Sequence, residues 1–479
     1  MALGHVDYGL MGVVGGLTAF ITFFNGIMCG AIGRFYAISV GTQRINKNEG
    51  LESCRKWFTT AVLLSTVFPT ILIVTGYPIG AWAVENFLTV PADRIVDCLW
   101  VWRFVCISCF LGMVSVPFSA MYGAHQYIAE LTLYSFATTT LNACFLYYMV
   151  THPGVWLSRF AFWQLLLSIL PQVIIAIRAC FLFPECRFRF AYVRCGRQVR
   201  ELLGYSLWNA WGWFGAVLRE QGIAVLVNKY FGPKVNAGVA VGSNLSGHCN
   251  TLSGSMIGAF SPAIFNAWGA HDYDRARAMA YQTCKIGSLL ILIFALPLAL
   301  EVENVLKLWL VNPPLYASGI CLFVMLMNVI DKMAVGHMIC VNANGKVARY
   351  QAFLGTSLVC TLPIAWVLII LDVGVYSIGY AMVMTMCVCA GGRVWFARTL
   401  VGMSARYWVR HVFFPVVAVA CLSGLCGLVP RLFLPESFWR ICLTTIVVES
   451  TMLPLTWILA LSQEEKAFVV QKVGRFLKR

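Results

Sequence analysis

The chain has 479 residues, of which 60% are apolar and 11% are charged, and its mean hydropathy is +0.77. A soluble globular protein is closer to half apolar and a quarter charged, so this composition excludes that class. Continuous apolar runs, rather than short alternating segments, also exclude a transmembrane β-barrel. The composition therefore predicts an all-α polytopic membrane protein with little mass outside the bilayer.

Thirteen apolar segments reach the ~20 residues that a helix needs to cross the hydrocarbon core. In chain order they lie at 10–32, 58–84, 99–121, 128–150, 155–183, 203–231, 237–264, 284–306, 315–341, 352–371, 374–399, 406–428 and 437–461. We predict a membrane-spanning helix for each segment.

The distribution of basic residues gives the orientation. The net charge is +15, and 24 of the 35 lysines and arginines lie in the loops after odd-numbered spans, at the adjoining span ends or in the C-terminal tail, against five on the opposite side. Because cytoplasmic loops are enriched in lysine and arginine, the C-terminus is expected in the cytoplasm, together with loops at 33–57, 184–202 and 393–410. The positive charge thus reflects membrane topology, and no nucleic-acid partner is expected.

A weak internal repeat accompanies this topology. The run Gly4-His5-Val6-Asp7-Tyr8-Gly9 precedes one apolar helix, and the loosely similar run 232–238 precedes another. A long helix at 203–231 comes before the second run, whereas none comes before the first. We expect two homologous halves and fourteen helices in the intact protein, with the first helix missing, either because the start codon was assigned late or because this version is incomplete and inactive.

No segment carries a recognisable catalytic, nucleotide-binding or metal-binding motif. The loops are too short for a catalytic domain, so an enzyme is not expected. Most of the 19 cysteines lie singly inside apolar runs, where cysteine behaves as a small hydrophobic residue, and no metal or cofactor is expected. Prolines lie in or near eight spans and fit helices that bend during transport, although proline is also ordinary in membrane helices.

Several short motifs resemble a known family. The first half contains Leu3-Gly4-x3-Tyr8-Gly9 and, after an apolar helix, Gly33-Arg34-Phe35-Tyr36. The second half contains Arg219-Glu220-Gln221-Gly222, Asn228-Lys229-Tyr230-Phe231-Gly232-Pro233, Asn236-Ala237-Gly238, Ser261-Pro262-Ala263-Ile264, Leu308-Trp309-Leu310 and Pro313-Pro314. Together these resemble Wzx-type polysaccharide flippases of the multidrug/oligosaccharidyl-lipid/polysaccharide exporter (MATE-like) superfamily, over nearly the whole chain.

The resemblance implies a MATE/MOP-like bundle of two lobes around a central cavity. Residues 1–183 would form the N-terminal lobe without its first helix, 184–202 a basic cytoplasmic linker, 203–399 the C-terminal lobe, and 400–479 two extra helices with a basic tail. The implied function is translocation of a lipid-diphosphate-linked oligosaccharide across the bacterial cytoplasmic membrane by alternating access, for surface polysaccharide or lipopolysaccharide biosynthesis. Implied partners are this substrate, membrane lipids and other polysaccharide-assembly membrane proteins.

Charged residues at membrane depth are the candidate site residues, because each costs at least ~2.5–3.5 kcal/mol there unless it faces a cavity or a partner. Arg219 is the first candidate for a phosphate contact, with a structural ion pair as the alternative. Arg34 is the second, with snorkelling to the interface as the alternative. The remaining candidates for the cavity lining are Lys332, Asn244 and Asn250. Glu220 and Asp331 are candidate coupling groups or counter-charges, and Glu220 could pair with Lys332.

Two further functions stay open. A cation-coupled multidrug antiporter of the same fold usually carries an acidic coupling residue in its first lobe, and the spans of the first half contain no Asp or Glu at depth. The missing helix is where the family most often places that acid. A membrane scaffold without transport would not need arginine, aspartate and lysine at depth.

Overall fold

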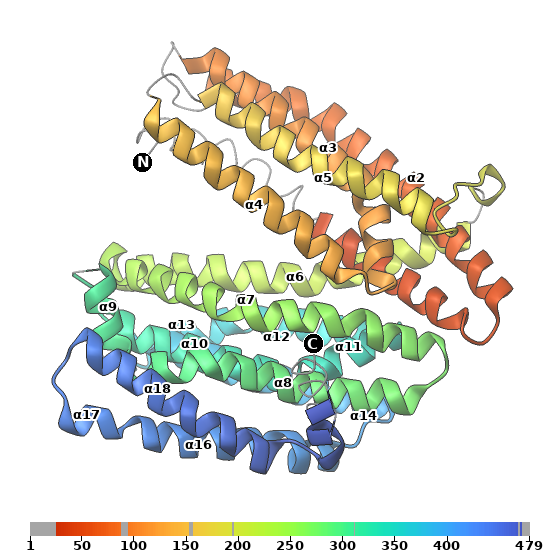
Figure 1. The fold of residues 1–479 in the computed structure, drawn as a ribbon. Coiled ribbons are helices and arrows are strands. Elements are labelled where there is room, and N and C mark those ends of the chain that lie inside the picture. Colours follow the sequence, from red (N-terminus) through yellow and green to blue (C-terminus); the bar gives the residue numbers. More distant parts are fainter. Residues whose placement is uncertain are drawn as a thin grey trace. The chain divides into compact units, whose positions relative to one another are not determined.

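The structure is a computed structural model that describes residues 25–87, 94–152, 157–193, 196–310, 312–467 and 470–471. Across these residues the regular structure is helical and contains no strand (Figure 1). The predicted all-α class is confirmed. The run from Gly4 to Gly9 and most of the predicted span 10–32 lie outside the described residues.

The chain divides into two compact units, which are described separately. Unit 1 comprises the described residues up to Ala210 together with Phe265–Asp272, and unit 2 comprises Trp211–Ile264 and the residues from Tyr273 onward. The long helices α6 (Gly196–Phe231) and α7 (Pro233–Gly269) therefore contribute residues to both units.

Unit 1 is built around one central helix, α3 (Ile95–Ala124). After a helix over 25–42 come α2 (Lys47–Trp82), which continues as a π-helical turn (Ala83–Phe87), then α3, α4 (Ile128–Thr151) and α5 (Leu157–Leu182). Helix α3 packs against both α2 and α5. Gly80 permits part of this contact, since a Cβ atom there would lie 2.1 Å from the Trp102 ring.

Unit 2 is organised around α8 (Tyr273–Leu300) and α14 (Ser377–Val401), which contact most of its other helices. The helices between them are α9 (Val302–Leu310), α10 (Ala317–Met333), α11 (Val335–Asn344), α12 (Ala348–Val359) and α13 (Thr361–Ile370). Helix α11 approaches α8 closely because Gly336 has no side chain; a Cβ atom there would lie 1.9 Å from the Ala280 carbonyl oxygen.

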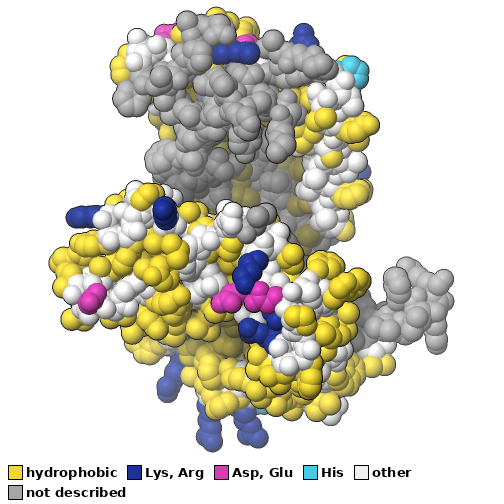
Figure 2. All heavy atoms as spheres, turned by 90° about the vertical axis from the view of Figure 1, so that its left-hand side faces the viewer, with side chains coloured by type: hydrophobic (Ala, Val, Ile, Leu, Met, Phe, Trp, Pro, Cys, Tyr) yellow, Lys and Arg dark blue, Asp and Glu magenta, His cyan; other side chains and the backbone are white. Residues whose placement is uncertain are grey.

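The last helices of the chain pack onto α8. They are α15 (Ala405–Trp408), a π-helical turn (Val409–Phe413), α16 (Phe414–Gly427), α17 (Val429–Phe433), α18 (Phe438–Leu455) and a second π-helical turn (Thr456–Ala460). Leu289 and Leu292 of α8 share an apolar core with Val416, Val419 and Met452. Figure 2 shows acidic and basic side chains among hydrophobic ones on one face of this unit. One ion pair of the unit joins Lys307 of α9 to Glu436 at 2.6 Å.

Eight helices of the described ranges are long and apolar enough to cross a membrane, or nine if the bent pair α10 and α11 counts as one span. Each predicted span from 58–84 onward coincides with a helix or a broken helix. However, α4, α6 and α7 are not among the eight or nine, so the predicted thirteen crossings are supported only in part by length and composition.

Helices extend into all three segments predicted as loops. Residues 33–42 are helical and α2 begins at Lys47, α6 begins at Gly196, and α14 continues to Val401. Capping explains two of these boundaries: the side chains of Asn46 and Ser404 accept hydrogen bonds from the backbone N–H groups of Glu49 and Tyr407. Hydropathy marks only the apolar part of a helix, so it places the polar helix ends in loops.

Candidate functional site

A cluster of charged side chains lies inside unit 2, on α6, α10 and α14. Arg219, near the middle of α6, has only 5% of its surface exposed. Its Nε and Nη1 atoms have no hydrogen-bond partner among the described residues. The charges that act on it are those of Glu220, the next residue, and then Asp331 of α10 and Arg393 of α14, so its guanidinium lies close to these two helices. The neighbouring Glu220 is exposed, as expected for consecutive residues on a helix.

Asp331 is the carboxylate of this cluster, and two cations hold it. Its Oδ1 atom accepts from Nη1 of Arg393 at 2.7 Å, and its Oδ2 atom lies 3.2 Å from Nζ of Lys332. The Arg393 side chain is buried, whereas Asp331 and Lys332 keep 23% and 13% of their side-chain surfaces exposed. The counter-charge of Lys332 is therefore Asp331, and the suggested pairing of Lys332 with Glu220 is not observed.

The cluster lies beside a break in the helix. Helices α10 and α11 meet at Ala334 with a bend of 44°. Such a break frees backbone carbonyls, which must find partners at membrane depth. Two side chains supply them: Nη1 of Arg393 lies 3.1 Å from the Asp331 carbonyl oxygen, and Nε1 of Trp408 donates to that of Met333 at 2.8 Å. The break is thereby fixed by α14 and α15.

The charges of the cluster do not cancel. Three cations, Arg219, Lys332 and Arg393, accompany two carboxylates, the half-buried Asp331 and the exposed Glu220, which leaves one excess positive charge. An excess of positive charge away from water is costly unless an anion compensates it. The arrangement is therefore suited to binding an anionic group and not to binding a cation. Among the residues that the structure describes, no group of His, Cys, Asp and Glu side chains is arranged to hold a metal ion.

His337, one turn beyond the break, has a structural environment. It is fully buried, its Nδ1 atom lies 3.5 Å from Sγ of Cys284, and its ring meets those of Tyr281 and Trp408 edge to face. These contacts join α11 to α8 and α15. His337 therefore supports the broken helix by packing and does not take part in the ion pairs of Asp331.

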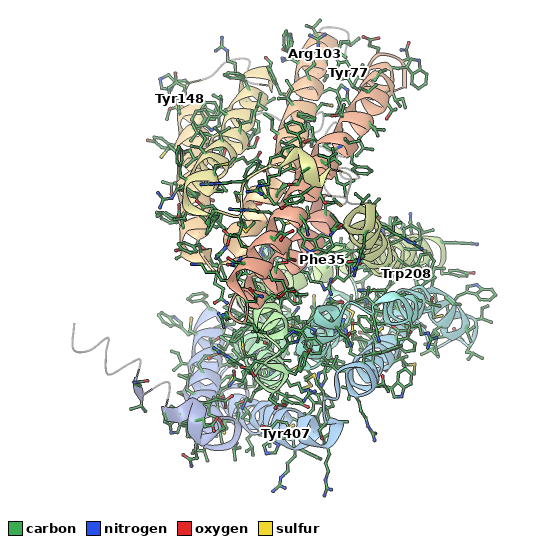
Figure 3. All side chains as sticks on the ribbon, turned by 90° about the vertical axis from the view of Figure 1, so that its right-hand side faces the viewer. Phe35, Tyr77, Arg103, Tyr148, Trp208 and Tyr407 are labelled. Atoms are coloured by element: carbon green, nitrogen blue, oxygen red, sulfur yellow. The ribbon has the colours of Figure 1, made fainter. Side chains whose placement is uncertain are left out.

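Arg34 belongs to unit 1 and has different surroundings. Its side chain is buried at 6% exposure, and its guanidinium lies 4.7 Å from the ring centroids of both Phe35 and Tyr205. Phe35 in turn stacks on Trp57 at 4.0 Å (Phe35 is labelled in Figure 3). Cation–π contacts of this kind stabilise a desolvated guanidinium. Arg34 is thus packed among aromatic rings inside unit 1.

The polar residues of α7 do not form one stripe. Asn244 and His248 are exposed and share a side of the helix, whereas Asn250 is half-buried. A separation of six residues places Asn250 about 120° away from Asn244 around the helix. His248 lines a cavity of about 340 Å³ with residues of α8 and α18.

Arg393 is the member of the cluster that sequence reasoning missed. Its position near the end of the predicted span 374–399 places it, by sequence, among the cytoplasmic charges. In the structure it lies within α14, eight residues before the helix ends. The sequence contained an indication of this role, because Arg393 lies inside an apolar span, where a charged residue requires a partner, and Asp331 in another span could provide it.

Comparisons with known proteins bear on the fold. No family model matches the sequence, and no curated protein matches it. Solved structures do match: a MATE transporter in the bent conformation (TM-score 0.66, 12% identity, 84% of this chain and 88% of that chain) and an outward-facing multidrug resistance MATE family transporter of the MOP superfamily (TM-score 0.66, 13% identity, 84% and 89%). A third is a MOP superfamily transporter from Pyrococcus furiosus, with a TM-score of 0.65, 13% identity, and coverage of 84% and 91%. The chain therefore has the fold of MATE transporters of the MOP superfamily.

Proposed function

We propose that this protein translocates a lipid-diphosphate-linked oligosaccharide across the bacterial cytoplasmic membrane by alternating access. The observation that carries the proposal is the excess of positive charge in unit 2, where Arg219 is buried and two of its nitrogens have no hydrogen-bond partner within the described part of the chain. A substrate of this class has a diphosphate that hydrocarbon does not dissolve and a lipid tail that stays in the bilayer.

The chemistry of Arg219 suits a diphosphate. A guanidinium presents its N–H groups as a planar fork that can grip phosphate oxygens in pairs, and such charge-assisted bonds are stronger than neutral ones. Lys332, half-buried and paired with Asp331, would add a point charge for the second phosphate. The anion would compensate the buried guanidinium, which the carboxylate of Asp331 does not do.

The cation-coupled multidrug antiporter is the alternative, and the surroundings of Asp331 disfavour it. A coupling carboxylate must bind and release a proton or a metal cation during each cycle. Asp331 already contacts Arg393 and Lys332, both of which favour its charged, unavailable form. The structure of the Pyrococcus furiosus transporter is described under the words "reverse polarity of binding pocket suggests different function", so pocket polarity differs among proteins of this fold.

A binding experiment tests the proposal. Purified protein in detergent is titrated with a polyprenyl-diphosphate saccharide, and the Kd is measured for the wild type, Arg219→Gln and Arg219→Lys. Loss of a hydrogen-bonded charge at Arg219 should weaken binding roughly tenfold to a hundredfold in the Gln variant, and less in the Lys variant, where a point charge remains.

Glu220→Gln is the matched control, since Glu220 is the exposed neighbour of Arg219 on the same helix. It should bind the diphosphate at least as tightly as the wild type, because the substitution removes a negative charge near Arg219. Equal binding by Arg219→Gln and the wild type would overturn the proposed role of Arg219. If the Arg219→Gln protein instead fails to accumulate in the membrane, the arginine has a structural role in unit 2.

A further inference from the structure

Two cavities open at one end of unit 1, on either side of a ridge formed by Trp100 and Phe104 of α3. Their volumes are about 500 and 550 Å³, and both are lined by these two residues. The two rings lie 5.5 Å apart, and Phe104 also contacts Phe162 of α5 at 5.6 Å. The ridge is therefore fixed by ring packing.

The larger cavity has the shape and lining of a site for a hydrocarbon chain. Its walls come from α2, between Thr70 and Tyr77, and from α3, between Trp100 and Leu111. At 1.5 Å per residue, the α3 wall is about 16 Å long. That length matches one leaflet, because half of the hydrocarbon core is about 15 Å thick. The lining is almost wholly apolar except at one end.

Each cavity is lined by one arginine. Arg103 lines the larger cavity, is exposed, and donates from Nε to the hydroxyl of Tyr77 at 3.1 Å, while its guanidinium lies 4.8 Å from the Trp100 ring. Figure 3 labels Arg103 and Tyr77 on neighbouring helices of this unit. Arg159 lines the smaller cavity. No Asp or Glu is among the described residues lining either cavity.

We propose that this end of unit 1 binds one two-chain anionic phospholipid, in the outer leaflet if the loop at 33–57 at the other end of α2 is cytoplasmic as the basic residues predict. The phosphate lies on Arg103, and the two acyl chains enter the two cavities on either side of the Trp100–Phe104 ridge. Tyr77 and Trp100 hold the guanidinium at the mouth of the larger cavity, where a freely snorkelling arginine would have no fixed position. A single-chain lipid would fill one cavity and leave the other empty. The inference does not rest on the proposed function, because it concerns neither Arg219 nor the transported substrate.

Native mass spectrometry of the purified full-length protein tests this site, with phosphatidylglycerol, phosphatidylcholine and a polyprenyl phosphate as probes. The wild type should retain one phosphatidylglycerol more strongly than phosphatidylcholine. Arg103→Gln should weaken that binding roughly fivefold, the effect of one basic residue near an anionic lipid, and Arg103→Lys should restore most of it. Arg94→Gln, at the same end of α3 but lining neither cavity, should bind like the wild type.

Three results would overturn the site. Equal retention of phosphatidylcholine and phosphatidylglycerol would mean that no anion is recognised. Unchanged binding by Arg103→Gln would place the lipid elsewhere. Displacement of phosphatidylglycerol by an equimolar amount of polyprenyl phosphate would identify the occupant as the lipid carrier instead.

Discussion

The two units differ in the kind of polar contact that they bury between their helices. In unit 1 the contacts at depth are between neutral groups: the hydroxyls of Ser108 and Ser168 lie 2.6 Å apart, and Nε2 of Gln164 donates to Asn142 at 3.0 Å. Unit 2 has neutral contacts as well, such as the hydroxyls of Thr361 and Thr385 at 2.9 Å, but it also buries ion pairs, such as Asp331 with Arg393. The described charged pairs of unit 1 lie at or near helix ends, for example Arg178 with Glu130.

This difference has an energetic meaning. A neutral hydrogen bond between membrane helices contributes little, about 0.6 kcal/mol on average, and can be exchanged for another. A buried ion pair is costly to break, because the remaining partner is an uncompensated charge. Unit 2 therefore holds its buried charges in fixed ion pairs, and the proposed anion site depends on this fixed arrangement. The following predictions test the contrast, from the largest expected effect to the smallest.

The largest effect is expected at Glu301 of unit 2. This buried carboxylate accepts from Nε and Nη2 of Arg440 at 3.0 and 2.8 Å and from the Thr444 hydroxyl at 3.1 Å, and so ties the α8–α9 junction to α18. Glu301→Ala should lower the free energy of unfolding by about 3–5 kcal/mol. Thermal or denaturant unfolding in detergent measures it. The exposed Glu303→Ala is the control, and a loss below about 1 kcal/mol at Glu301 would contradict the contrast.

The second prediction concerns the pair at the helix break. Arg393→Gln leaves Asp331 with a single cation and should destabilise the protein by about 3 kcal/mol. Asp331→Asn in the same chain removes the orphaned charge and should recover most of that loss. A double-mutant cycle by unfolding in detergent measures the coupling. Strictly additive effects of the two substitutions would show that the pair does not act as a unit.

A much smaller effect is expected in unit 1. Ser108→Ala removes the hydroxyl pair between α3 and α5 and should cost about 0.6 kcal/mol, with the Ser168→Ala variant giving a similar value. The same unfolding measurement serves here. A loss comparable with that of Glu301→Ala would remove the distinction between the two units.

The smallest effect should appear as a pH dependence at one end of unit 1. Burial alone would raise the pKa of Glu185, but the His125 ring 3.5 Å away and a hydrogen bond from Gln43 outweigh it and hold that pKa below its usual 4.5. A depressed pKa stabilises the fold above the usual value, and this contribution is lost as the pH falls through the lowered pKa. Glu185→Gln should therefore flatten the stability profile below pH 4.5. If the loss of stability at acid pH is the same in Glu185→Gln as in the wild type, Glu185 does not cause it.

Much of the fold was predictable from sequence, for physical reasons. A membrane helix must be apolar over ~20 residues, so segments such as 99–121 and 374–399 identify α3 and α14 directly. The break at Ala334 was not predictable, because it depends on side chains from other helices, Arg393 and Trp408, which satisfy the freed carbonyls. Helix ends were misplaced where capping by Asn46 and Ser404, rather than hydropathy, sets them.

The sequence indicated which residues belong to the candidate site but not which of them form ion pairs. The cost of charge in hydrocarbon singled out Arg219, Asp331 and Lys332, which the structure brings together in one cluster. Which residues pair was not predictable, since Glu220 and Asp331 are both acidic and only the burial of one of them decides. Arg34 lies in unit 1 among aromatic rings, and sequence alone gave no indication of Tyr205 as its neighbour.

Translocation in reconstituted vesicles tests the central claim, which is that the positive cluster of unit 2 handles an anionic lipid-linked substrate. Vesicles containing wild type, Arg219→Gln or Glu220→Gln protein receive a fluorescent polyprenyl-diphosphate saccharide in one leaflet, and a membrane-impermeant quencher reports its arrival in the other. We expect wild type and Glu220→Gln to translocate it, Arg219→Gln to do so at least roughly tenfold more slowly, and a neutral glycolipid to remain in place. Equal rates for wild type and Arg219→Gln, or proton-coupled uptake of a cationic drug in place of lipid translocation, would contradict the account.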